Sequence, residues 1–81
     1  MPIEHEDTGD SDIVAEMVAN VWKVVTAPGA TVAEGDTLVI LESMKMEIPV
    51  LTEHAGRVSA VKVAAGDVVQ EGDVLVSLDL T

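Results

Sequence analysis

The sequence predicts an all-β domain, a small sandwich or barrel, and three observations point to it. Valine occurs fifteen times among 81 residues, whereas Phe and Tyr are absent and Trp22 is the only aromatic residue. β-Branched side chains are stiff and pack well on a pleated sheet. Short apolar runs alternate with turns rich in Gly, a pattern typical of small all-β folds. Finally, the chain repeats itself after 37 residues.

The first residues, 1–12, are polar and rich in Asp and Glu. Such composition cannot bury enough apolar surface to fold, so we expect a disordered acidic tail. The folded domain is then predicted over residues 13–81.

Six apolar runs in this domain are predicted strands: Ile13–Val18, Val21–Val25, Thr37–Glu42, Ile48–Thr52, Arg57–Val63 and Val74–Asp79. The segment Val14–Lys23 also suits a helix by propensity, but Asn20 and its β-branched neighbours favour a hairpin there. Gly supplies the positive φ that tight turns need. The predicted turns are Pro28-Gly29, Glu34-Gly35-Asp36, Ala65-Gly66-Asp67 and Glu71-Gly72-Asp73.

The repeat covers most of the domain. With a shift of 37 residues, residues 14–41 align with residues 51–78, and twelve of the 28 positions are identical. The identities include both the turn glycines and the strand valines. We therefore expect two copies of one unit around a pseudo-two-fold axis, each covering the apolar face of the other.

The charge balance limits the possible partners. Fifteen acidic residues outnumber four basic ones, for a formal net charge of −11. Such a chain repels nucleic acid and anionic membranes, and its protein partners should present basic surfaces. No signal peptide is visible and no apolar run approaches the ~20 residues of a membrane-spanning helix, so we expect a soluble cytoplasmic protein. The lack of Cys agrees with a reducing compartment.

One segment, Glu42-Ser43-Met44-Lys45-Met46-Glu47, joins the two repeats and is not explained by them. Its flanking apolar strands would bring Lys45 to an exposed hairpin tip. Two methionines are unusual there, since Asn, Gly or Asp is expected in such turns. Met44 and Met46 could tuck inward, but if exposed they indicate a surface that another molecule binds.

This segment resembles the biotin attachment motif of the biotinyl/lipoyl carrier domain family. The repeat, the two Glu-Gly-Asp turns and Ala55-Gly56-Arg57-Val58 resemble the same family, over roughly residues 13–79. The resemblance implies a flattened barrel of two four-stranded antiparallel sheets. It also implies that Lys45 carries covalent biotin, that Met44 and Met46 are recognised by a biotin protein ligase, and that Glu42, Ser43 and Glu47 belong to the surface the ligase reads.

The same resemblance implies a function. The chain would be a non-catalytic biotin carboxyl carrier, whose biotin takes up CO2 at a biotin carboxylase subunit and delivers it at a carboxyltransferase subunit. The isolated chain is expected to be a monomer. Ala19 departs from the family pattern by replacing a turn glycine that its repeat partner Gly56 keeps, which questions the geometry of the first turn.

Alternatives remain at this point. Lipoyl domains share the fold but usually carry Asp-Lys-Ala or a similar triplet, so biotin is favoured over lipoate. The chain could also be a biotinylated binding or regulatory protein that serves no carboxylase. Trp22 could contact a partner, but a core or half-buried strand position is favoured. Lys23 and Lys62 are alternative modification sites in principle, but both lie within strand patterns and not on a hairpin tip, which favours plain surface charges. The two histidines are too isolated for metal binding or catalysis, and we expect neither.

Overall fold

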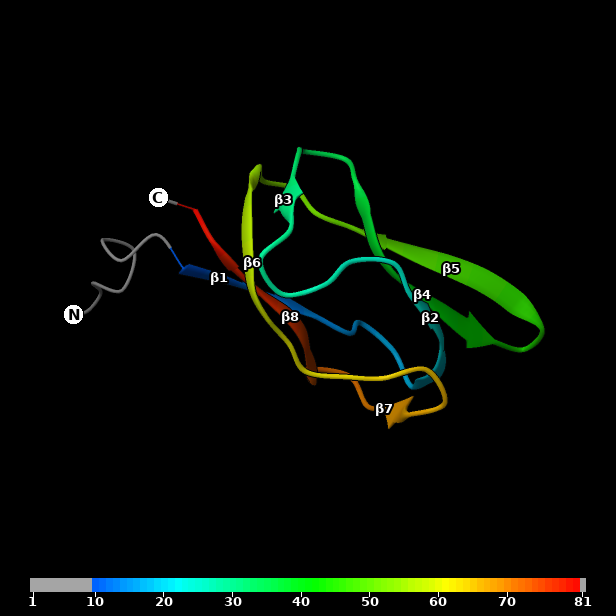
Figure 1. The fold of residues 1–81 in the computed structure, drawn as a ribbon. Coiled ribbons are helices and arrows are strands. Elements are labelled where there is room, and N and C mark those ends of the chain that lie inside the picture. Colours follow the sequence, from blue (N-terminus) through cyan, green and yellow to red (C-terminus); the bar gives the residue numbers. More distant parts are fainter. Residues whose placement is uncertain (1–9, 81) are drawn as a thin grey trace.

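The computed structural model describes residues 10–80, which form eight β-strands (Figure 1). All their pairings are antiparallel. Between residues 10 and 80 there is no helix that could cross a lipid bilayer. The strands are β1 (Asp10–Val14), β2 (Ala19–Val24), β3 (Thr31–Val32), β4 (Thr37–Ser43), β5 (Met46–Leu51), β6 (Gly56–Val61), β7 (Val68–Val69) and β8 (Val74–Asp79).

Two four-stranded sheets are formed, in the orders β1-β8-β6-β3 and β5-β4-β2-β7. This confirms the predicted flattened barrel. Each sheet has two strands from the first half of the chain (β1–β4) and two from the second (β5–β8). The halves are therefore interlocked, and neither could form its sheet alone.

The repeat is visible in the strand bounds. Adding 37 to the bounds of β2 and β3 gives those of β6 and β7. The turns repeat as well: the N–H of Ala33 donates to the Asp36 carboxylate at 2.9 Å, and the N–H of Gln70 donates to the Asp73 carboxylate at 2.9 Å. The glycine before each aspartate has a φ of 91° or 92°. The backbone N–H of each aspartate donates in return to the carbonyl of the same residue, Ala33 or Gln70, at 3.0 Å. Asp and Gly thus build the same β-turn in both halves.

Backbone hydrogen bonds join each turn to the other half. The N–H of Gly35 donates to the carbonyl of Thr52, and the N–H of Gly72 donates to that of Ala15, both at 2.8 Å. Because each turn is completed by the opposite half, the pseudo-two-fold arrangement satisfies backbone groups that would otherwise lie unpaired.

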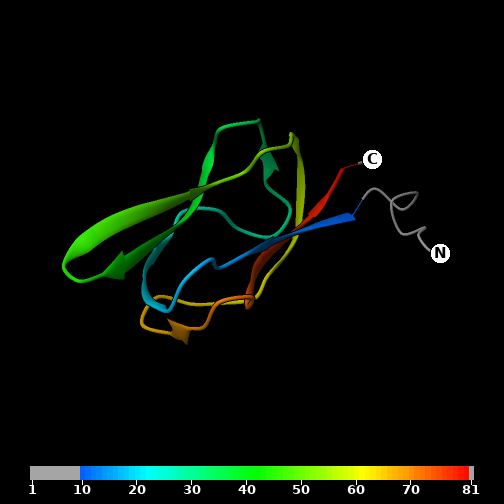
Figure 2. The same cartoon turned by 180° about the vertical axis from the view of Figure 1, so that it is seen from behind.

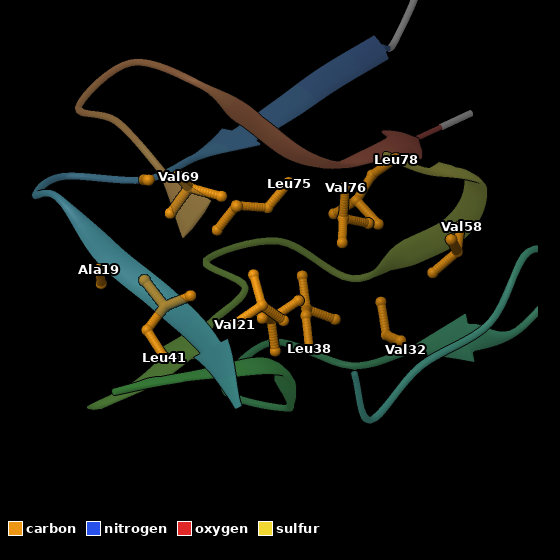
Figure 3. Close-up of a cluster of buried hydrophobic side chains, with 12 residues drawn as sticks. Ala19, Val21, Val32, Leu38, Leu41, Val58, Val69, Leu75, Val76 and Leu78 are labelled. Carbon is orange, nitrogen blue, oxygen red and sulfur yellow. The ribbon is translucent and has the colours of Figure 1, made fainter. Parts of the chain in front are cut away.

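The core lies between the sheets. Figure 3 shows Leu75, Val76 and Leu78 pointing toward Val21 and Leu38 of the opposite sheet. Burying a leucine or valine side chain stabilises the fold by about 1.5–3 kcal/mol. Five identical repeat pairs supply most of the buried side chains: Val21 and Val58, Val32 and Val69, Leu38 and Leu75, Val39 and Val76, and Leu41 and Leu78.

The first predicted strand, Ile13–Val18, is misplaced. β1 covers Asp10–Val14 and pairs with β8, so Asp10–Asp12 do not belong to a disordered tail. Residues 1–9 of the predicted tail lie outside the described residues. The predicted hairpin around Asn20 is also wrong, because β1 and β2 lie in different sheets. Local propensity could not show that the partner residues of β1 lie 60 to 69 residues further along the chain.

Two strands, β3 and β7, were not predicted from the sequence. β3 and β7 have only two residues each, too few to show an alternating pattern. They are repeat equivalents, and each pairs with a strand of the other half, β3 with β6 and β7 with β2. Long-range pairing therefore creates these strands at the sheet edges.

Candidate functional site

The β4–β5 hairpin projects from one end of the molecule (Figures 1 and 2). Lys45 lies in the turn that joins the two strands. The two strands pair from Thr37 and Leu51 up to Ser43 and Met46, leaving Met44 and Lys45 as a two-residue turn. The predicted hairpin tip is thus confirmed as a turn apex. The start of β1 and the end of β8 lie at the opposite end of the molecule (Figures 1 and 2), where Asp10 pairs with Asp79.

The turn backbone is unusual for its residues. Met44 and Lys45 have φ of 53° and 65°, and they are the positive-φ residues other than Gly in the described chain. Positive φ at both central positions is the geometry of a type I′ turn, which favours Asn-Gly. The left-handed conformation costs about 1–2 kcal/mol for an ordinary L-residue. Met44 and Lys45 therefore occupy these positions in spite of their turn propensity, which makes the turn a candidate functional site.

The tip is open to solvent. Met44 is 90% exposed and Met46 is 61% exposed, so neither methionine tucks into the core. Lys45 is also exposed, and no residue between 10 and 80 holds its ammonium in a hydrogen bond or ion pair. An amine flanked by two exposed apolar side chains is accessible to an enzyme and offers it apolar contact area.

Two carboxylates flank the turn. Glu42 on β4 lies directly opposite Glu47 on β5, one register position below the pair formed by Ser43 and Met46. Like charges directly opposite each other in a sheet are destabilising. The pair leaves a local negative charge next to the single cation of the turn, so a basic surface would be attracted to this end of the hairpin.

The base of the hairpin is anchored in the core. Leu41 is 2% exposed, and Ile48, directly opposite it, packs against the core cluster. The paired strands β4 and β5 therefore connect a base packed in the core to an exposed tip only a few residues away. This arrangement fixes the backbone of the turn in a defined place and leaves the amine of Lys45 open to solvent.

The other candidate residues lie away from this tip. Trp22 is 47% exposed, so it is not a core residue, and it lies where the register of β2 against β4 shifts. Lys23 lies on β2, whereas Lys62 follows the end of β6, and both are exposed. Within the described part of the chain, no group of three His, Asp or Glu side chains is placed to hold a metal ion.

The comparisons with known proteins agree with this geometry. The model of a family described as "Biotin-requiring enzyme" matches residues 11–78. The chain is 58% identical over 52 residues to the biotinylated protein TB7.3 homologue of Mycobacterium leprae, a match that covers 64% of this chain and 73% of that protein.

Two solved structures extend the comparison. A single-chain, multi-domain long-chain acyl-CoA carboxylase matches with a TM-score of 0.84 and 31% identity, over the whole of this chain and 8% of that one. The lipoyl domain of the 2-oxoglutarate dehydrogenase complex from Azotobacter vinelandii matches with a TM-score of 0.66 and 28% identity, over 75% of this chain and 77% of that domain. The fold is thus shared with a part of an acyl-CoA carboxylase and with a lipoyl domain.

Proposed function

The chain belongs to the biotinyl and lipoyl attachment domain family, and we propose that it carries biotin on Lys45 for a biotin-dependent carboxylase. The observation that supports this most directly is the exposed amine at the apex of a two-residue turn. A carrier needs an attachment point that is accessible to one enzyme for loading and to others for reaction. Lys45 meets that requirement, whereas Lys23 and Lys62 lie on the body of the domain.

The residues around Lys45 fit a biotin amide. Lys45 must first lose a proton, because only its free amine can attack. The Nζ then bonds to the carboxyl carbon of activated biotin, the bond from that carbon to the activating group breaks, and the nitrogen releases one further proton to become an amide. An amide is neutral, so the formal net charge changes from −11 to about −12. No buried partner of the ammonium is lost, because no residue between 10 and 80 pairs with it.

Biotin is favoured over lipoate by the two methionines. Met44 and Met46 are exposed on either side of Lys45, where a biotin protein ligase would contact them together with Glu42, Ser43 and Glu47. The named relative is a biotinylated protein. The structural match to a lipoyl domain supports lipoate as the second candidate, because the two cofactors use the same fold.

As a carrier, the chain supplies position and reach. Biotin, when bound, supplies CO2 uptake and transfer at a ring nitrogen. The Lys45 stem and the biotin side chain together extend on the order of 12 Å, from ordinary bond lengths. The anchored hairpin base keeps this arm on one end of the domain, and tethering keeps the local cofactor concentration at roughly millimolar. The partners would be biotin carboxylase and carboxyltransferase subunits, and a cytoplasmic location stays a prediction.

Intact mass spectrometry tests the assignment. Protein made with an active biotin protein ligase should gain about 226 Da, whereas lipoylation would add about 188 Da. Lys45→Arg should abolish the gain and leave the unfolding temperature nearly unchanged, because the side chain makes no contact that supports the fold. Lys23→Arg and Lys62→Arg are matched controls that should keep the full gain. A biotin-sized gain that persists in Lys45→Arg would contradict the proposal.

A second experiment separates a carboxylase carrier from a biotinylated binding protein. The biotinylated chain is used to capture partners from cells, with Lys45→Arg chain as the control. Recovery of a biotin carboxylase or carboxyltransferase subunit supports the carrier. Recovery of neither subunit supports the alternative, a biotinylated binding or regulatory protein.

A further inference from the structure

A hollow lies between the edge strands β1 and β5, beside the base of the Lys45 hairpin. Its volume is about 320 Å³, and Leu41 lies among the residues that line it. Every other lining residue belongs to a repeat pair whose partner also lines the hollow, such as Ile13 with Val50, and Val14 with Leu51. The hollow therefore lies on the pseudo-two-fold axis and is a product of the way the halves interlock.

The walls of this β1–β5 groove are apolar and partly uncovered. Val14 and Met17 are each 39% exposed, and Leu51 is 49% exposed. Three large apolar side chains are thus exposed around one hollow, and apolar side chains exposed together indicate a surface that binds a partner. The size of the hollow is enough for a few side chains of another molecule.

The groove also carries negative charge. Asp12, Glu16 and Glu53 line it, and no Lys or Arg is among its lining residues. All three are exposed on the domain surface. A bound segment must therefore bring apolar side chains for the walls and positive charges for the rim, since like charges would be repelled.

The backbone offers a third feature. In the described chain, β1 pairs with β8 alone and β5 with β4 alone, so each has a free edge of N–H and C=O groups. β5 contains Pro49, which lacks an N–H and occurs in edge strands with that side facing outward. β1 has no proline. Of the two, β1 offers the more complete edge to an added strand.

We propose that the β1–β5 groove binds an extended, basic segment of a partner protein that adds to β1, with Lys or Arg alternating with aliphatic residues. Successive side chains of a strand point to opposite faces. In an added strand, every second side chain therefore enters the groove and the others point out of it, so the segment must alternate between aliphatic and basic residues. A second copy of this chain is a poor occupant, since each copy has a formal net charge of −11. Nucleic acid and anionic membranes are excluded by the same repulsion.

The test uses the complete chain labelled with 15N and a short peptide in which Lys alternates with Val. Saturable NMR shifts should appear at the amides of Ile13, Val14 and Leu51 and weaken as salt is added. Trp22, which does not line the groove, should keep its fluorescence. A peptide with Glu in place of Lys should produce no shifts. A peptide with all Lys residues grouped at one end should bind less tightly.

A matched pair of variants checks the site. Glu16→Gln with Glu53→Gln removes both rim carboxylates of one repeat pair and should weaken peptide binding roughly 2- to 30-fold, for two exposed ion pairs. Glu34→Gln with Glu71→Gln makes the same charge change at another exposed repeat pair that does not line the groove. These control variants should bind within about twofold of the unchanged chain.

Three results would overturn the proposal: no saturable shift, equal weakening by both variant pairs, or concentration-dependent shifts at the groove without peptide, which would mean that a second copy occupies it. Biotinylation is measured separately by intact mass. A chain that gains biotin but does not bind the peptide refutes the groove alone. A chain that binds the peptide without gaining biotin refutes only the proposed function.

Discussion

The two halves of this molecule have matching turns and core side chains, but they end differently. β4 continues beyond Ser43 through Met44 and Lys45 into β5, whereas its repeat equivalent β8 ends at Asp79. The leucines that precede both ends are equally buried, at 2% for Leu41 and 0% for Leu78. The same packing therefore supports a projecting hairpin in one half and a strand end in the other. Positions where the halves agree build the fold, and the candidate site lies where they differ.

Smaller differences between the halves have local explanations. Thr52 is buried, and its repeat partner Ala15 is buried without a polar group. Gly56 lies beside the carbonyl oxygen of Asp79, whereas Ala19 keeps a methyl group at the equivalent place. Gly56 lies in β6 and has no positive φ, so its glycine is not required by turn geometry. What Gly56 allows is the close approach of the Asp79 backbone, and Ala19 has a methyl group at the equivalent position.

The largest expected effect tests whether the halves share one core. Leu38→Ala and Leu75→Ala each remove a fully buried side chain at equivalent positions. Each should lower the free energy of unfolding by about 2–5 kcal/mol, because the lost burial and the cavity add. Urea unfolding followed by circular dichroism measures both. If the two losses differ severalfold, the packing equivalence of the halves is wrong.

The next effect concerns the close approach at Gly56. A Cβ there would lie 2.8 Å from the Asp79 carbonyl oxygen and 3.0 Å from a methyl carbon of Leu80. Gly56→Ala should therefore lower the free energy of unfolding by about 1–3 kcal/mol, since the backbone of β8 must shift. Thermal unfolding provides the measurement. Gly29→Ala separates the two possible causes of a loss. A Cβ at Gly29 would meet no atom, so any loss there comes from the positive φ and not from a steric clash.

A smaller effect is expected at Thr52. Its hydroxyl donates to the His54 carbonyl at 2.7 Å and accepts from the His54 N–H at 3.1 Å. Thr52→Ala copies the first repeat and should cost about 1 kcal/mol of stability, because the loop loses both bonds. Ser59→Ala removes an exposed hydroxyl that bonds to the Ser77 carbonyl and should cost less. Equal losses in the two variants would mean that burial of Thr52 has no influence.

The smallest expected effect is a gain in stability, at Met44 in the hairpin turn. Met44→Asn places a residue that tolerates positive φ at the first central position of the turn. It should raise the free energy of unfolding by about 0.5–1 kcal/mol while slowing biotin attachment, which timed intact-mass measurements would follow. Met46→Asn lies outside the positive-φ positions and should give no such gain. A stabilised Met44→Asn that is modified at the normal rate would remove Met44 from ligase recognition.

The interpretation of the sequence succeeded where information is local or repeated. Valine-rich runs and Gly-Asp turns predicted strands β2, β4, β5, β6 and β8 to within about two residues. The 37-residue shift predicted the pseudo-two-fold, and the tip containing Lys45 was placed correctly. The number of strands in each sheet came only from resemblance to a family, since β3 and β7 are too short to leave a pattern.

By itself, the sequence determined the β class, the two equivalent units and the exposed lysine between them, because side-chain period and turn chemistry are properties of neighbouring residues. Only the tertiary structure decided that β1 pairs with β8, that the halves exchange strands between sheets and that a groove opens between β1 and β5. Those features depend on hydrogen bonds between residues far apart in the chain. An apolar residue at the right period shows that it faces a core, but it does not show which strand will lie beside it.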